Sequence, residues 1–297
     1  MFVHELAAVA AAALWAFTGI LAAAPSQHLG AIAFNRMRMV MVFALLGVWV
    51  GFAGTWDTLR SDMIGPLVLS GFIGIFLGDT ALFLTMNRLG PRRTAILFSL
   101  NAPMSVVLGW LVLGEALSTR TLAGVAITLA GVVLAIAFGK RRSQLHVWES
   151  VKGPLWLGLL LGLAAALAQS VGSLIARPVM ETGVDPVAAS MLRIGVAAAG
   201  LTLLMQLPVQ RFQAANPATA GIAFQVLLTG LLGMGVGMTL VLFALSGGKV
   251  GIVSTLSATT PALQLPLLWL RTGEMPAPAA WLGAVLVVAG GALLFGL

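Results

Sequence analysis

Long runs without a charged side chain divide the sequence into apolar segments about as long as a membrane span. Such runs include residues 39–56, 94–114, 121–139, 153–176 and 250–270. A helix rises about 1.5 Å per residue, so about 20 apolar residues cross the hydrocarbon core of a bilayer. The runs lack the alternation of apolar and polar residues that is typical of barrel strands, which favours helices.

These runs predict an all-α integral membrane protein with ten transmembrane helices. Only 8% of the side chains are charged, against roughly 25% in soluble domains. The mean hydropathy is +1.05, and a soluble chain of 297 residues could not bury that much apolar surface in one core. The expected spans are residues 5–24, 37–54, 64–86, 94–113, 121–138, 154–177, 188–207, 218–244, 250–270 and 278–296.

The basic residues are distributed unevenly among the expected loops. Eleven of the sixteen Lys and Arg residues lie in or beside loops that follow odd-numbered spans. By the positive-inside rule these loops face the cytoplasm, which places both termini outside it. We therefore expect a multi-pass protein of the cell inner membrane. The net charge of +7 is attributed to this topology signal and not to nucleic-acid binding.

The second half of the sequence repeats features of the first at an offset of 159 residues. The segment GIFLGDTALFL at residues 74–84 aligns with GMGVGMTLVLF at residues 233–243. The same offset pairs Gly74 with Gly233, Gly78 with Gly237, Thr80 with Thr239, Gly114-Glu115 with Gly273-Glu274, Gly124 with Gly283, and Gly131 with Gly290. Small gaps in loops pair Gly19 with Gly172 and Arg38 with Arg193.

Each copy of this repeat contains five expected spans, so the second copy enters the membrane inverted relative to the first. Residues 1–139 form the first unit, residues 140–153 a basic linker, and residues 154–297 the second unit. Inverted repeats are a recurring plan of secondary transporters, because two similar halves of opposite orientation give two similar packings, each open to one side. Duplication in a membrane protein of another function is the alternative.

The paired five-helix units resemble paired EamA domains, the ten-helix branch of the drug/metabolite transporter superfamily. The resemblance rests on the Gly-Glu pair that ends the fourth span of each unit, and on Arg38 and Arg193 at the start of the second. The resemblance covers residues 5–296. The chain is similar in length and architecture to the amino-acid exporters of that family. The resemblance implies two inverted five-helix repeats around a central cavity that opens to one side at a time.

Polar residues and prolines gather in the fourth and ninth spans, whereas the fifth and tenth are almost entirely apolar. Polar groups in these spans need partners away from lipid, so they should face the interior. Helices broken at equivalent places in the two halves indicate a transporter's binding site. The candidates for substrate binding are Ser99, Asn101, Thr255 and Thr260, and the candidate hinges are Pro103, Pro261 and Pro266.

The first and sixth spans supply further substrate-binding candidates near mid-depth. Trp15, Phe17 and Thr18 lie in the first span, and Gln169 and Ser173 in the sixth. Two aromatic rings offer a wall for an amphipathic solute, although packing between helices is an equal alternative for Phe17. The amide of Gln169 lies within a run of Ala and Leu, where it needs a hydrogen-bond partner.

Asp79 is the only acidic residue well inside an expected span. An intramembrane carboxylate indicates substrate binding or proton transfer, and pairing with Arg88 or Arg92 is the structural alternative. The repeat pairs Asp79 with Met238, so a second acid is missing. The first span also lacks the glutamate of the small multidrug members of the superfamily. Proton antiport is therefore in doubt, and facilitated diffusion or exchange remains open.

Four other charged residues also recur in the repeat. Arg38 and Arg193 either receive a substrate carboxylate or reach lipid phosphates with their long side chains, and the second is favoured. Glu115 and Glu274 are expected to anchor the structure.

The expected function is the export of amino acids, aromatic ones among them, or similar small metabolites by alternating access. A broad exporter of drugs or amphipaths is the alternative within this fold. An intramembrane enzyme or a scaffold is the alternative from another class, but the three histidines form no HExxH pair and no GxSxG motif occurs. Cysteine is absent, and neither a metal nor a cofactor is expected. The expected partners are the solute and membrane lipid, with a monomer as the working assembly.

Overall fold

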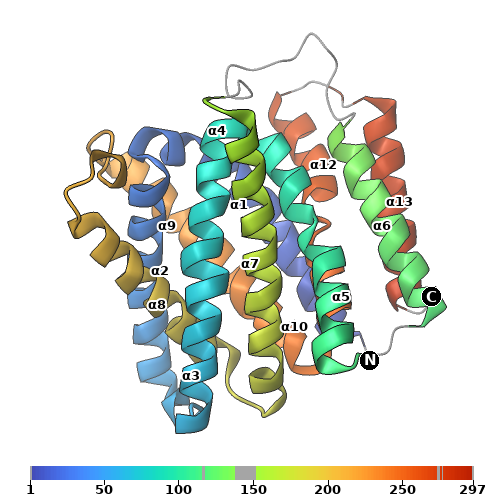
Figure 1. The fold of residues 1–297 in the computed structure, drawn as a ribbon, viewed down its shortest axis with the longest axis horizontal. Helices are drawn as coiled ribbons and strands as arrows, with labels where there is room; N and C mark the ends of the chain where they lie inside the picture. Colours follow the sequence, from blue (N-terminus) through green and yellow to red (C-terminus); the bar gives the residue numbers. More distant parts are fainter. Residues whose placement is uncertain (1, 116–117, 138–151, 273–274, 276, 296–297) are drawn as a thin grey trace.

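The structure is a computed structural model that describes residues 2–115, 118–137, 152–272, 275 and 277–295. Within these residues every regular element is a helix, and the helices stand side by side in one bundle (Figure 1). The all-helical class is confirmed for the described part of the chain. The expected basic linker at 140–153 falls almost wholly outside the described residues, as does Glu274.

The helices follow one another with short connections. The first half contains α1 (Val3–Leu29), α2 (Ala31–Ala53), η1 (Thr55–Thr58), α3 (Ser61–Ser70), η2 (Gly71–Leu77), α4 (Gly78–Ser99), α5 (Asn101–Leu113) and α6 (Thr119–Ala137). The second half contains α7 (Leu155–Glu181), α8 (Pro186–Gln206), η4 (Gln210–Phe212), α9 (Ala220–Gly230), η5 (Leu231–Gly237), α10 (Met238–Gly247), α11 (Val250–Ser257), α12 (Thr260–Thr272) and α13 (Pro278–Phe295).

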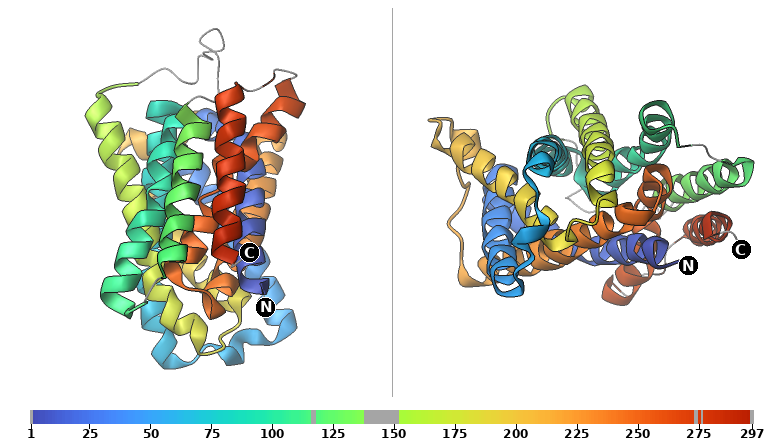
Figure 2. Two further views of the ribbon diagram at one scale, coloured as in Figure 1. Left: turned by 90° about the vertical axis from the view of Figure 1, so that its right-hand side faces the viewer. Right: turned by 90° about the horizontal axis from the view of Figure 1, so that it is seen from below.

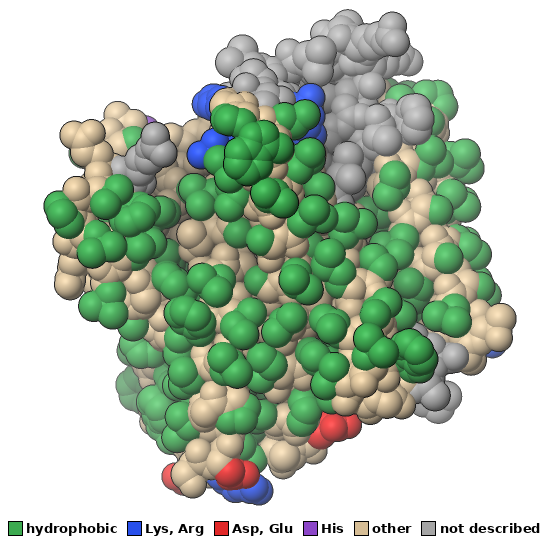
Figure 3. Space-filling model, viewed as in Figure 1, with side chains coloured by type: hydrophobic (Ala, Val, Ile, Leu, Met, Phe, Trp, Pro, Cys, Tyr) green, Lys and Arg blue, Asp and Glu red, His purple; other side chains and the backbone are tan. Residues whose placement is uncertain are grey.

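Within the described residues, seven helical stretches are long and apolar enough to cross a membrane. They are α1, α2, Ser61–Gly90, Arg93–Leu113, α7, α8 and Ala220–Gly247. Gly90 has φ 82° and separates the third stretch from the fourth. Two shorter apolar helices are Thr119–Leu134 and Pro278–Leu294. Apolar side chains cover the face in Figure 3 between charged groups gathered toward its two ends, so the chain is a multi-pass membrane protein.

Two helices extend beyond their expected ends. Pro25, which follows the expected end of the first span at residue 24, lies inside α1. Helix α2 begins at Ala31 and not at residue 37. The expected start at residue 37 left Arg36 outside the span and placed Arg38 in its first turn, but Arg38 is only 6% exposed. Its charge is satisfied inside the bundle, so Arg38 does not mark the start of the helix.

The two halves interrupt their helices at corresponding positions. The π-helix η5 occupies, to within one residue, the positions that the 159-residue offset assigns to the π-helix η2. Leu100 separates α4 from α5, and the offset pairs it with Thr259, which lies between α11 and α12. Pro103 and Pro261 occupy the first turns of the helices that follow, where a missing backbone N–H costs little. The predicted breaks therefore lie just before these prolines.

The segments containing η2 and η5 cross the bundle in opposite directions. Ser26, near the end of α1, donates a hydrogen bond to Asn87 at 3.2 Å. The part of α4 that follows η2 therefore finishes beside the end of α1. His4, near the start of α1, lies 3.0 Å from the carbonyl oxygen of Phe243. Helix α10 therefore finishes beside the opposite end of α1.

Glycines bring α6 and α13 together at one edge of the bundle (Figure 2). A Cβ on Gly131 would lie 2.6 Å from the carbonyl oxygen of Gly283, and one on Gly124 would lie 3.0 Å from that of Gly290. The backbones therefore approach more closely than larger residues would permit.

Candidate functional site

A cavity lies between helices of both halves of the chain. Its empty volume is about 1040 Å³, part of which is open to the surroundings. The first half contributes residues from α1, α2 and α4, and the second half contributes residues from α7, η5, α10, α11, α12 and the break between the last two. The cavity is lined mainly by apolar groups, with a few polar side chains from both halves.

Seven of the thirteen residues predicted for the site line this cavity. Six of them are substrate-binding candidates and the seventh is a candidate hinge: Trp15, Thr18, Asp79, Ser99, Gln169, Thr260 and Pro261. They come from the first, third, fourth, sixth and ninth expected spans. The structure therefore brings together side chains that lie as far as 246 residues apart in the sequence.

The other six predicted residues are not among the cavity-lining residues of the described chain. Phe17 is 42% exposed, and Ser173 is buried. Asn101 donates its amide to the carbonyl of Phe98 at 2.6 Å, and the Thr255 hydroxyl donates to the carbonyl of Gly251 at 2.7 Å. The two remaining residues are Pro103 and Pro266, which lie in α5 and α12.

Trp15 connects the cavity wall to the second half of the chain. Its indole N–H donates a hydrogen bond of 2.8 Å to the carbonyl of Gly233 in η5. Thr18 lies one turn further along α1, and a Cβ on Gly233 would approach its hydroxyl to 3.1 Å. The polar part of Trp15 is therefore satisfied by the backbone, which leaves its ring to face the cavity.

Asp79 pairs with Arg38 and not with Arg88, one of the two partners in the structural alternative; the side chain of the other, Arg92, lies outside the described part of the chain. Nη2 of Arg38 donates to Oδ2 of Asp79 at 2.5 Å and to Oδ1 of Asn35 at 3.1 Å. Both members of the pair are buried and both line the cavity. A charged pair away from water persists only when its groups are mutually satisfied, so the bundle interior and not the helix end supplies the partner.

Arg38 and Arg193 do not reach lipid phosphates, because they are only 6% and 1% exposed. The favoured interpretation of their side chains was therefore wrong. Nη1 of Arg193 lies 3.5 Å from Sδ of Met238, and the charge of Asp79 also acts on Arg193. The two arginines that correspond in the repeat are thus both interior residues.

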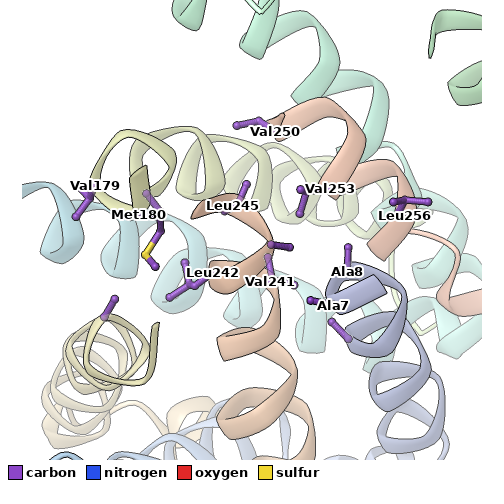
Figure 4. Packing of buried hydrophobic residues seen from close by; sticks show 14 of the residues in the cluster. Ala7, Ala8, Val179, Met180, Val241, Leu242, Leu245, Val250, Val253 and Leu256 are labelled. Atoms are coloured by element: carbon purple, nitrogen blue, oxygen red, sulfur yellow. The ribbon is translucent and has the colours of Figure 1, made fainter. Parts of the chain in front are cut away.

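A packed apolar cluster lies at one end of the cavity, and Figure 4 shows part of this cluster. Along α1, Ala7 and Ala8 belong to the cluster, whereas Trp15 and Thr18 line the cavity. The same change occurs along the ninth span, where Val250, Val253 and Leu256 pack in the cluster and the residues that line the cavity follow them, namely Ser257, Ala258, Thr260, Pro261 and Gln264. The cavity therefore ends where α1, α7, α10 and α11 meet.

Glu115 joins the two halves at this closed end. Its Oε1 accepts a hydrogen bond of 2.9 Å from the backbone N–H of Val250, the first residue of α11. The same oxygen lies 3.9 Å from Nε of Arg177 in α7. Its expected anchoring role is consistent with these contacts.

Several cavity residues were not among the sequence candidates. Arg38 was expected to reach lipid phosphates, and Phe83, Met86 and Gln264 were not candidates. The available signal was the lone carboxylate of Asp79, because a buried acid requires a partner and Arg38 was the basic residue that also recurred in the repeat. Among the described residues, no group of three or more His, Cys, Asp or Glu side chains could hold a metal ion.

A membrane-spanning helical bundle with a partly polar cavity between its two halves is the architecture of a small-solute transporter. The chain belongs to the EamA-like transporter family, whose model matches residues 3–137 and again residues 156–296. This membership supports the expectation that the protein is a transporter and not an enzyme.

Similarity to known proteins is consistent with membership of this family. The chain is 30% identical over 209 residues to a probable terminal-alkyne amino-acid exporter of Streptantibioticus cattleyicolor. The match covers 67% of this chain, but it spans less than two thirds of the relative, namely 63%. A crystal structure with 22% identity superimposes with a TM-score of 0.79, covering 98% of this chain and 95% of the other. That likeness supports the fold.

Proposed function

We propose that the protein exports amino acids, aromatic ones among them, or similar small metabolites by alternating access. The observation that carries this proposal is the cavity, which draws polar lining residues from both halves and is closed at one end. Trp15, Thr18 and Asp79 come from the first half, and Gln169 and Thr260 from the second. The probable amino-acid exporter related to the chain supports the substrate class.

The mechanism requires the two halves to change their packing. The chain has ten spans in two inverted five-helix repeats, residues 1–139 and 154–297, with both termini outside the cytoplasm of a cell inner membrane. The seven long stretches, the two short apolar helices and the broken pair α11–α12 account for these ten spans. The opposite directions of the segments around η2 and η5 support the inversion. Lipid surrounds a monomer.

The helix breaks at Leu100 and at residues 258–259 serve as hinges in this mechanism. Each break lies beside cavity residues, because Ser99 precedes the first and Thr260 follows the second. A helix that is already interrupted can bend without losing further backbone hydrogen bonds. Pro103 and Pro261 keep the breaks in place, since neither can donate the backbone hydrogen bond that would join the two helices.

A broad exporter of amphipathic compounds is the second candidate function. The observation that favours it is the apolar character of the lining, to which Leu82, Phe83, Met86 and Phe98 contribute. Such walls bind any solute with a large apolar group. The two candidates predict different competitors for transport. Only other amino acids compete with an amino acid for an amino-acid exporter, whereas hydrophobic dyes also compete for a broad exporter.

Counterflow of radiolabelled amino acids in proteoliposomes tests the proposal. Accumulation in liposomes loaded with unlabelled amino acid, and not in protein-free liposomes, is the expected result. Gln169→Leu removes a polar lining group at nearly constant volume and should weaken apparent affinity roughly two- to tenfold. Gln206→Leu, at the exposed end of α8, is the matched control. Inactivity across all amino acids, with efflux of dyes, would leave the second candidate in its place.

A further inference from the structure

The two interior arginines have corresponding but chemically different partners. The 159-residue offset pairs Asp79 with Met238. In the structure Nη2 of Arg38 contacts the Asp79 carboxylate at 2.5 Å, and Nη1 of Arg193 contacts the Met238 thioether at 3.5 Å. The repeat therefore preserves the contact in both halves. It replaces a charged acceptor in the first half by a weak, neutral one in the second.

This replacement leaves a positive charge without a counter-charge. Arg38, Arg193 and Asp79 are all at least 93% buried, and Asp79 acts on both arginines. The other buried ion pair of the described chain, between Arg177 and Glu115, lies at the closed end. Two cations thus share one anion beside the cavity. A buried charge that lacks compensation is costly, and a ligand of opposite charge relieves that cost.

Arg38 is the member of this group that a ligand can reach. It lines the cavity, and its buried Nε has no hydrogen-bond acceptor within the described residues. Its guanidinium carbon lies 4.6 Å from the centre of the Phe83 ring and 5.6 Å from that of Phe34. Contact with two aromatic faces fixes the plane of the guanidinium, so its remaining donors are already oriented.

We propose that the cavity recognises its substrate through a carboxylate that binds Arg38, and that a substrate ammonium group is not required. Asp79 is shared by two arginines, so the net field at the site attracts an anion and gives an ammonium no advantage. The apolar part of the substrate lies against Leu82, Met86 and Phe98. The ligand class is therefore small monocarboxylates with an apolar group. Amino acids belong to it, so the inference rests on and sharpens the proposed function.

Competition among three matched compounds tests the inference. Phenylalanine has both charged groups, N-acetylphenylalanine keeps only the carboxylate, and phenethylamine keeps only the ammonium. We expect N-acetylphenylalanine to inhibit counterflow about as well as phenylalanine, and phenethylamine to be weaker by about tenfold or more, the loss of one hydrogen bond to a charged group. Equal inhibition by phenethylamine, or none by N-acetylphenylalanine, overturns the inference while leaving amino-acid transport standing.

Binding measurements separate this inference from the proposed function. If no amino acid is transported, binding of 3-phenylpropionate to the purified protein, followed by tryptophan fluorescence, still reports carboxylate recognition. Saturable binding that phenethylamine does not displace supports the inference even though the proposed function fails. If 3-phenylpropionate also fails to bind when no amino acid is transported, both the inference and the proposed function are overturned.

Two variants change the charge of the site in different ways. Arg38→Gln removes the carboxylate donor and should abolish the preference for N-acetylphenylalanine over phenethylamine. Met238→Asp keeps Arg38 but gives Arg193 its own counter-charge, and should lower that preference by about tenfold. Arg60→Gln, in an exposed ion pair with Asp62, is the matched control and should keep the preference. An unchanged preference in folded Met238→Asp protein overturns the inference, even if Arg38→Gln fails to fold.

Discussion

The indole N–H of Trp15 donates a hydrogen bond to the carbonyl of Gly233, across 218 positions of sequence and 2.8 Å of space. This bond joins α1 of the first half to η5 of the second beside the cavity. Gly233 contributes its backbone because it has no side chain to hold the helices apart. The same residue in the first half, Gly74, packs against Gly172 of α7, so each π-helix contacts a helix of the opposite half.

Trp15→Phe should destabilise the protein while keeping an aromatic wall in the cavity. The change removes one buried hydrogen bond, which costs about 1 kcal/mol, and leaves the Gly233 carbonyl without its side-chain donor. A lower midpoint of thermal unfolding in detergent, with substrate counterflow retained, is the expected result. Trp15→Ala also removes the ring and should abolish counterflow. Equal stability of wild-type protein and Trp15→Phe would show that the bond contributes nothing.

Gly172→Leu should prevent the two halves from packing. A Cβ at Gly172 would lie 2.7 Å from Cα of Gly74. Because Cα belongs to the backbone, it cannot move aside without shifting the helix. Size-exclusion profiles in detergent should show aggregated or unfolded protein. The control is Gly51→Ala in α2, because nothing lies within 4 Å of a Cβ there. Gly51→Ala should stay monodisperse. If both variants aggregate equally, the cause is the loss of a glycine in general and not the contact between Gly172 and Gly74.

Asp79→Asn should destabilise the fold strongly. It leaves Arg38 and Arg193 buried without an anion, and removing one member of a buried pair costs about 3–5 kcal/mol. Denaturation in detergent, followed by tryptophan fluorescence, measures the loss. Asp62→Asn breaks the exposed pair with Arg60 and should change stability little. If Asp79→Asn is stable and alters only the pH dependence of transport, then Asp79 is a proton carrier.

Glu115→Ala should loosen the closed end of the cavity. The change removes the acceptor for the Val250 N–H and the carboxylate beside Arg177. The chain contains no cysteine, so a single Val253→Cys reporter within the apolar cluster can be labelled without background. Labelling should be faster in the Glu115→Ala background. Glu181→Ala removes the exposed partner of Arg177 and should leave the rate unchanged.

Two surface cysteines test the proposed topology. Asp57→Cys lies in the connection after α2, and Ala215→Cys lies in the connection before α9. A membrane-impermeant maleimide added to intact cells should label Asp57→Cys and should label Ala215→Cys only after permeabilisation. Labelling of both from the same side would contradict the inverted arrangement, and the reverse pattern would place the termini in the cytoplasm.

The sequence predicted the general organisation because hydrophobic runs and the repeat are properties of the chain itself. The offset found in the glycines also relates the two π-helices to each other and the two helix breaks to each other, since the two halves fold under the same local constraints. The ends of α1 and α2 were less predictable. Pro25 and Arg36 are typical of helix ends, but neighbouring helices accommodate them inside longer helices.

The sequence by itself determined a helical membrane protein, its two similar halves and seven of the residues that line the cavity. Only the tertiary structure decided that Asp79 pairs with Arg38 and that Arg193 faces Met238. A hydropathy pattern records the cost of placing each residue in lipid, but not the partner that offsets that cost. The partner of a buried charge depends on which helix faces which, and that is fixed by packing between segments distant in the sequence.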